Sequence, residues 1–186
     1  GAPGCARGDG GVAPGCPPGP CGNASPMGTM GGCLNSDARS ARLHRSGVAS
    51  VAADTLRFEM SGGTSSSFAI LTSGDNRAPN NMANPCFGLD SGLNAATLDG
   101  LRCVVGAVQR HGSRSTNAMG EVGTGVAGPG NQGWGPPSGP AGGLIAMGGF
   151  TSGQTRQYQV IYRENPALGC LTGQNTTQGV SVTFQP

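Results

Sequence analysis

Seven cysteines are the residues of this chain best suited to chemistry, because a thiol can form a disulfide, bind zinc or act as a nucleophile. They are Cys5, Cys16, Cys21, Cys33, Cys86, Cys103 and Cys170. The first four are separated by ten, four and eleven residues, and this spacing lacks the close Cys-x2-4-Cys pairs of structural zinc sites. Disulfides formed in an oxidising compartment are therefore the favoured interpretation.

Other catalytic and ligand-binding patterns fail on their context. The histidines, His44 and His111, have no nucleophile partner suggested by a motif, and residues 128–133 match G-x-G-x-x-G but precede a Pro-Pro pair instead of a helix. The nine acidic residues stand singly, so no carboxylate pair suggests a glycosidase. We expect no enzyme activity, no cofactor and no metal site.

Calcium is the one metal with candidate ligands, which lie in the segment 75–94. Their oxygens come from Asp75, Asn76, Asp90 and Asn94. They do not follow an ordered calcium-loop signature, so a loop with incidental acidic residues is the favoured interpretation and calcium binding is the alternative.

Trp134 is the single tryptophan, and it lies between two glycines in a long Gly/Pro-rich loop at 111–143. Loops of this length often carry a contact surface. The indole could stack on a sugar ring, or it could pack down onto a sheet. The packing role is the more common one and is favoured here.

The composition is poor in core-forming residues. The chain has 36 Gly and 14 Pro, and only 30 of its 186 residues are Leu, Val, Ile or Phe. A net charge of +2 is too low for a typical disordered chain, so disulfides or neighbouring subunits should help to hold the fold. The eleven basic residues are isolated arginines, so nucleic acid is not an expected partner. No apolar run approaches the ~20 residues of a membrane span.

Alternation of apolar and polar residues predicts strands along most of the chain after residue 41. The clearest is Thr155–Arg163, in which Tyr158, Val160 and Tyr162 share one face and predict a half-buried strand. Residues 41–45 and 180–184 are further predicted strands. Residues 55–60 and 67–72 predict a hairpin, and 100–110 predicts the longest apolar strand at the centre of the sheet.

These patterns predict an all-β protein in two parts. Residues 1–40 form an extended Gly/Pro/Cys-rich N-terminal arm, and residues 41–186 form an antiparallel, jelly-roll-like β-sandwich. The cysteines, and a start at Gly1 in place of Met, lead us to expect a mature protein that is secreted to the cell surface or beyond.

Several blocks of sequence occur in the same order in a known type of module. The most specific are Gly-Leu-Arg-Cys103 and Gln-Val-Ile-Tyr-Arg163, and the others lie at 21–23, 32–36, 53–56 and 179–184. Over residues 21–186 the chain resembles the uncharacterised β-rich modules found, usually C-terminally, in secreted proteins of planctomycete-type bacteria. Residues 1–20, the loop around Cys86 and the Trp134 loop depart from that pattern.

The resemblance implies a secreted β-sandwich with Cys103 paired to Cys170 and Cys21 paired to Cys33. Cys5, Cys16 and Cys86 then remain, and three thiols cannot all pair within one chain. Either Cys5 pairs with Cys16 and leaves Cys86 free, or Cys86 bridges to Cys5 or Cys16 of the same chain or of the next subunit.

Two functions are compatible with this architecture. The first is a non-catalytic structural subunit that associates with copies of itself, through the N-terminal arm, into an extracellular fibre or surface layer. The alternative is a carbohydrate- or cell-surface-binding module that uses the Trp134 loop to hold a polysaccharide. The small number of aromatic residues favours the structural subunit.

Overall fold

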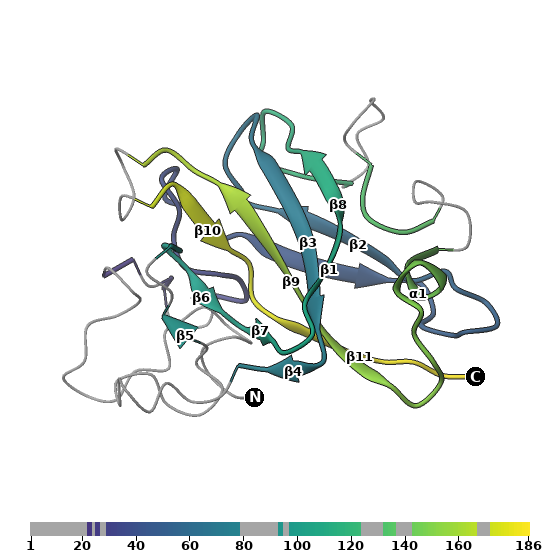
Figure 1. Cartoon of the computed structure of the whole chain (residues 1–186). Coiled ribbons are helices and arrows are strands. Elements are labelled where there is room, and N and C mark those ends of the chain that lie inside the picture. The colour runs from purple at the N-terminus through teal and green to yellow at the C-terminus, as the bar shows by residue number, and fades with distance from the viewer. Residues whose placement is uncertain are drawn as a thin grey trace.

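A computed structural model shows a chain built mostly of antiparallel strands (Figure 1). It describes residues 22–23, 25–26, 29–78, 93–94, 97–123, 132–136, 143–166 and 172–186. The all-β class predicted from the sequence is confirmed. The strands are β1 (Arg42–Ser46), β2 (Arg57–Ser61), β3 (Phe68–Gly74), β4 (Asn76–Arg77), β5 (Leu93–Asn94), β6 (Leu101–Arg102), β7 (Val104–Val105), β8 (Gln109–Ser115), β9 (Thr155–Arg163), β10 (Gln174–Thr176) and β11 (Val180–Thr183). One short helix, α1 (Gly143–Gly148), precedes β9.

The largest sheet has five strands and is organised around β9. Its order is β10-β9-β3-β8, and β11 also pairs with β9. β11 takes the first half of the β9 edge, where Val180 lies opposite Tyr158, and β10 takes the last part, where Asn175 lies opposite Tyr162. The strand predicted at 155–163 is therefore confirmed, and so is the strand at the C-terminus.

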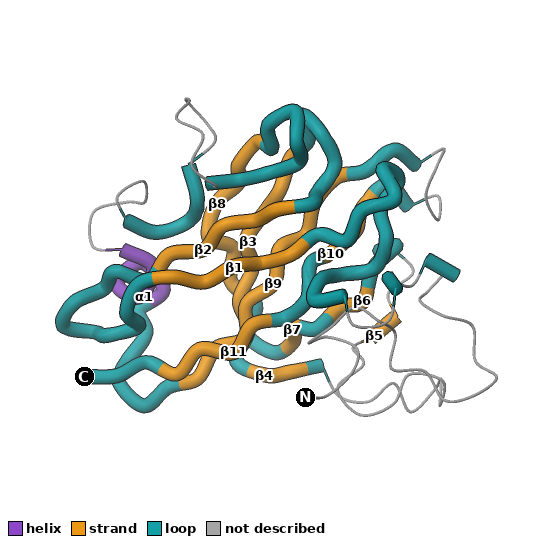
Figure 2. The backbone as a smooth tube through the Cα atoms, turned by 180° about the vertical axis from the view of Figure 1, so that it is seen from behind, coloured by secondary structure: helices purple, strands orange, loops and turns teal. Residues whose placement is uncertain are grey.

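β1 and β2 form a hairpin that lies behind this sheet in Figure 1 and in front of it in Figure 2. Leu43 pairs with Met60 in the register of the hairpin. The prediction that residues 55–60 pair with 67–72 is wrong, because β3 crosses to the large sheet and pairs with β8 and β9. The crossing is held by the hydroxyl groups of Thr64 and Ser67, which both donate to the Arg163 carbonyl.

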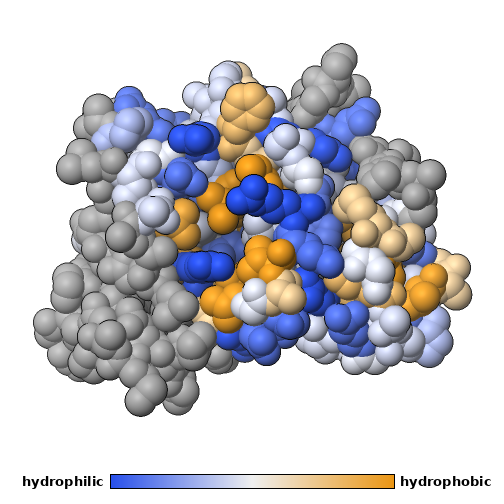
Figure 3. Space-filling model, in the orientation of Figure 1, coloured by the Kyte–Doolittle hydropathy of each residue, from blue (hydrophilic) through white to orange (hydrophobic). Residues whose placement is uncertain are grey.

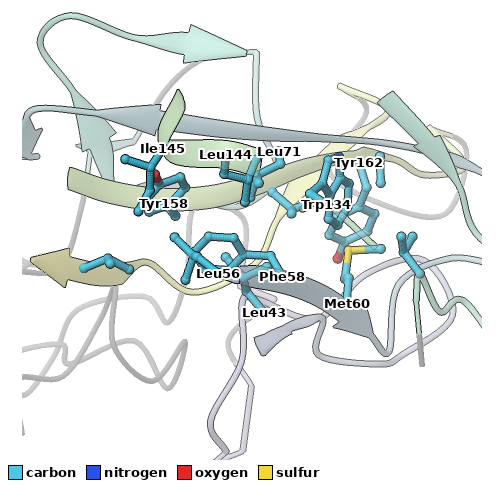
Figure 4. Packing of buried hydrophobic residues seen from close by; sticks show 14 of the residues in the cluster. Leu43, Leu56, Phe58, Met60, Leu71, Trp134, Leu144, Ile145, Tyr158 and Tyr162 are labelled. Carbon is cyan, nitrogen blue, oxygen red and sulfur yellow. The ribbon is translucent and has the colours of Figure 1, made fainter. Parts of the chain in front are cut away.

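The core fills the space between the hairpin and the large sheet (Figure 4). Leu56, Phe58 and Met60 point inward with no exposed surface, as their alternation predicts. The Phe58 ring lies 4.5 Å from the Tyr158 ring, which joins the two layers at their centre.

Trp134 is part of this core. It is fully buried, and its backbone forms a bridge to Phe58 in β2. The indole Nε1–H donates to the Gly112 carbonyl at 2.9 Å. The prediction that Trp134 packs onto the sheet is confirmed, and its use as a sugar-stacking contact is excluded because its ring has no exposed face.

β9 is buried on both faces, so the prediction of a half-buried strand is wrong. Gln157 and Gln159, expected on the solvent side, are 8% and 1% exposed. Residues Leu101–Cys103 lie over the outer face of β9 and cover Gln159. These two glutamines are therefore shielded from solvent, although the sequence pattern marks their face as polar.

The prediction of a long central strand at 100–110 is also wrong. The segment contains the two-residue strands β6 and β7 and then turns into β8, which is the edge strand of the large sheet. The turn is at Gly106, which has φ 83° and would bring a side chain into the Asp75 carboxylate. Leu101 and Val104 are buried because they pack on the outer face of the sheet instead of joining its ladder.

The cysteines depart from the predicted pairing. Cys33 is a free thiol that is 1% exposed and packs against Leu101, so the Cys21–Cys33 bridge implied by the resemblance is not formed. Gly32, which precedes Cys33, lies so close to the Thr176 backbone that no Cβ fits there. Cys103 is disulfide-bonded to a partner outside the described residues. Its pairing with Cys170 stays a prediction, and Cys5, Cys16, Cys21, Cys86 and Cys170 lie outside the described residues.

Burial makes Cys33 testable by alkylation. Burial raises the pKa of its thiol to about 12 from an ordinary value of 9.0, so the thiolate is roughly a thousandfold scarcer at pH 8. We expect iodoacetamide to leave Cys33 unmodified in the native protein and to modify it fully in urea, as measured by peptide mass spectrometry. A native peptide in which Cys33 is alkylated, or is linked to a second cysteine, would contradict this assignment.

Candidate functional site

A cavity of about 200 Å³ opens on the outer face of the large sheet, away from the β1–β2 hairpin. Figure 3 shows this face, on which hydrophilic and apolar side chains surround a recess. The lining residues come from strands β3, β6, β7, β8, β9 and β10 and from the loops beside them. They are Thr72, Thr97, Leu98, Arg102, Val104, Val108, Arg110, Gln159, Ile161 and Gln174.

The floor of the cavity is made by neighbouring residues of β3 and β9. Thr72 lies opposite Gln159 in the register, and its hydroxyl donates to the Gln159 carbonyl at 2.9 Å. The side-chain amide of Gln159 then makes three further bonds. Its Oε1 accepts from Cys103 N at 2.9 Å, and its Nε2 donates to the carbonyls of Leu101 at 2.8 Å and Thr177 at 2.7 Å.

These bonds fix the wall of the cavity, residues 97–104, onto the sheet. The backbone N–H of Asp99 donates to the Gln174 carbonyl at 2.7 Å, which ties the start of the wall to β10. Gly100 follows, and a side chain there would collide with Thr176 and Asn175. The wall can approach β10 this closely because residue 100 has no Cβ.

Two arginines stand at the cavity, Arg102 on the wall and Arg110 on β8, and we call the cavity the arginine pocket. The Arg102 Nε–H donates to the Val104 carbonyl at 3.0 Å, which orients its guanidinium group. Arg110 is exposed, and its guanidinium group makes no hydrogen bond or ion pair with the residues that the structure describes. The described lining contains no acidic residue, so the pocket carries positive charge.

This arrangement suits a planar anion. Guanidinium groups present rigid forks of N–H donors that match carboxylate oxygens and bind them in pairs. Val104, Val108 and Ile161 add aliphatic surface beside the charges. The pocket can therefore hold an anionic group that is carried on a partly apolar body.

The residues that we singled out from the sequence lie elsewhere. Trp134 is in the core, and Cys33 packs against Leu101 of β6. Of the calcium candidates, Asp75 accepts from Ala107 N at 2.8 Å and so closes a turn, whereas Asn76 and Asn94 belong to β4 and β5. Asp90 lies outside the described residues. The described residues hold no cluster of three or more metal-ligating side chains.

The sequence reasoning missed the pocket arginines and the histidine partners. Arg102 belongs to the Gly-Leu-Arg-Cys103 block, but nothing in the sequence brings it close to Arg110. Both histidines bond serines: His111 Nε2 lies 2.8 Å from Ser73 Oγ, and His44 Nε2 lies 2.8 Å from Ser61 Oγ. Burial lowers the pKa of His111 to about 4, with help from Arg156. His111 and Ser73 are 5% and 0% exposed, so this pair is structural.

Comparison with known proteins adds no relative. No family model, no curated protein and no solved structure matches this chain. The pocket is therefore the feature of this chain from which a function can be inferred.

Replacing Gln159 should release the pocket wall. Gln159→Leu keeps a similar volume but leaves the Cys103 N–H and the Thr177 carbonyl without their partner, and each buried unsatisfied group costs about 1–3 kcal/mol. We expect the free energy of unfolding to fall by about 2–4 kcal/mol in urea denaturation.

Gln157→Leu is the matched control, because Gln157 lies on the same face of β9 but its side chain bonds only Ser181 among the described partners. Its loss should be about 1 kcal/mol. Equal losses in the two variants would show that Gln159 does not anchor the wall.

Proposed function

We propose that this protein is a non-catalytic extracellular module that binds an acidic, carboxylate-bearing polysaccharide in the arginine pocket. The observation that carries the proposal is the meeting of Arg102 and Arg110 at one cavity whose described lining has no acidic residue. A carboxylate placed between them would receive charge-assisted hydrogen bonds, which are stronger than neutral ones. Thr97 and the Gln174 side chain offer further polar contacts for sugar hydroxyls.

The architecture supports a module of this kind. The β1–β2 hairpin and the large sheet enclose one core, which favours the jelly-roll-like β-sandwich that the sequence predicts. The disulfide at Cys103 supports an oxidising, extracellular location. The described part of the chain holds no helix with the length and apolarity that a membrane crossing requires.

A self-assembling structural subunit is the second candidate. The exposed side chains of Phe68 (63%) and Met119 (64%) favour it, because both are large apolar groups on segments that are joined by backbone bonds between 66–67 and 116–117. Several strand edges are closed to partners, however. Gln178 bonds both backbone groups of Leu43 on the β1 edge, and Val122 and Trp134 bridge the β2 edge. Self-association would therefore use this apolar surface or the N-terminal arm.

The pocket is tested by neutralising its two charges. We expect Arg102→Gln with Arg110→Gln to lower the affinity for polygalacturonate oligomers by about tenfold or more, because a hydrogen bond to a charged group contributes about 1.5–3 kcal/mol. Titration calorimetry measures the change. Wild-type binding should also weaken as salt is added, and neutral dextran should not bind.

The control is Arg42→Gln with Arg45→Gln, which removes the same charge from β1 on the opposite side of the core. It should bind like the wild type. Equal losses in both double variants would indicate non-specific charge attraction, and no loss in either would exclude the pocket. Tighter binding of duplex DNA than of polygalacturonate would replace the polysaccharide with nucleic acid as the partner.

A further inference from the structure

Two buried carboxyl groups meet beside the wall of the arginine pocket. Asp99 is fully buried at the start of the wall, and Glu164, 8% exposed, follows the end of β9. Glu164 Oε2 accepts from Ser36 N at 2.8 Å, whereas Oε1 is buried and receives no hydrogen bond from the described protein donors. Both residues are tied to the same short segment: the Glu164 N–H donates to the Gly173 carbonyl at 3.1 Å, and the Thr172 N–H donates to the Asp99 carboxylate at 3.3 Å. Two neighbouring buried carboxyl groups can share a hydrogen bond only when one of them carries a proton.

Asp99 also holds the wall of the pocket in place. It directly follows Thr97 and Leu98, which line the cavity, and its N–H donates to the Gln174 carbonyl. Its carboxylate accepts from Thr172 N at 3.3 Å, just before β10. A movement of Asp99 would therefore also move the wall and Gln174. Both line the arginine pocket.

Glu164 is the group in this cluster whose charge changes near neutral pH. Burial and the neighbouring Asp99 raise the pKa of Glu164 to about 7 from an ordinary value of 4.5. Cys33 and Tyr162 face it from the 31–36 segment and from β9, and burial raises the pKa of both, so they stay neutral there. The next charged group, Arg39, is already in an ion pair with Asp37 at 2.6 Å.

We propose that Asp99 and Glu164 form a proton-operated latch that controls ligand binding in the arginine pocket. With the proton present, the two carboxyl groups share a hydrogen bond and the wall is closed on β10. When the proton leaves to solvent, two carboxylates face each other in a buried site, and their repulsion loosens residues 97–99. The effect on binding rests on the proposed function, whereas the movement of the wall does not.

The test compares the wild type with Glu164→Gln over pH 6 to 9. Glutamine has the shape of a protonated glutamate, carries no charge and can donate to Asp99. Wild-type affinity for polygalacturonate should fall above pH 7 by up to about tenfold per pH unit, which is the limit for one linked proton. The variant should stay flat. Arginines and sugar carboxylates keep their charge over this range, so they cannot cause the fall.

Hydrogen exchange tests the latch without any ligand. The Asp99 and Thr172 amides should lose protection above pH 7 in the wild type, beyond the intrinsic rise of exchange with pH, and should keep it in Glu164→Gln. Glu121→Gln, which removes an acid whose carboxylate bonds Asn117 and not this cluster, should behave like the wild type. If the amides open but polygalacturonate does not bind, the latch stands and the proposed function fails. Identical pH profiles in the wild type and Glu164→Gln would overturn the latch.

Discussion

The side-chain amide of Gln159 bonds three backbone groups. They belong to two segments outside the ladder of the large sheet. Through Leu101 and Cys103 it holds the pocket wall, and through Thr177 it holds the turn between β10 and β11. Because Gln159 lies in β9, its bonds fix both segments relative to the large sheet. Arg102 stands between the two wall residues that Gln159 bonds, so the geometry of the arginine pocket depends on this one amide.

Gln159 represents a wider way of stabilising a chain that is short of large apolar residues. Gln178 bonds the N–H and the carbonyl of Leu43 and so replaces a neighbouring strand at the β1 edge. Asn35 accepts from the N–H groups of Asp37 and Arg39 and donates to the Gly62 carbonyl. Each amide satisfies backbone groups that have no partner in a strand ladder, and such groups cost free energy when they are buried and unpaired. Polar networks therefore supply order that we had expected to come from disulfides and subunits alone.

The sequence predicted the strands well where one face is apolar and the other polar. The inward set of Leu56, Phe58 and Met60 follows this rule, and the strand at Thr155–Arg163 was located correctly although its polar face is also covered. It failed at 100–110, because an unbroken apolar run does not distinguish a central strand from a segment that crosses over a sheet. It also misassigned the partner of β2, since alternation fixes which face is buried but not which strand lies alongside. The pocket could not be predicted, because Arg102 and Arg110 are brought together by a turn at Gly106 and not by periodicity.

Two buried groups among the described residues, His111 and Glu164, make opposite contributions to the pH dependence of stability. Burial lowers the pKa of His111 to about 4, so the unfolded chain binds more protons between about pH 4 and 6.5 and stability rises with pH there. Glu164 has the opposite shift, to about 7, so the folded chain binds more protons between about 4.5 and 7 and stability falls as pH rises. The two slopes have opposite signs and oppose each other where the windows overlap. The stability of the wild type can therefore stay flat over that overlap although both groups titrate. The slope due to His111 appears only when Glu164 is replaced, and the slope due to Glu164 only when His111 is replaced.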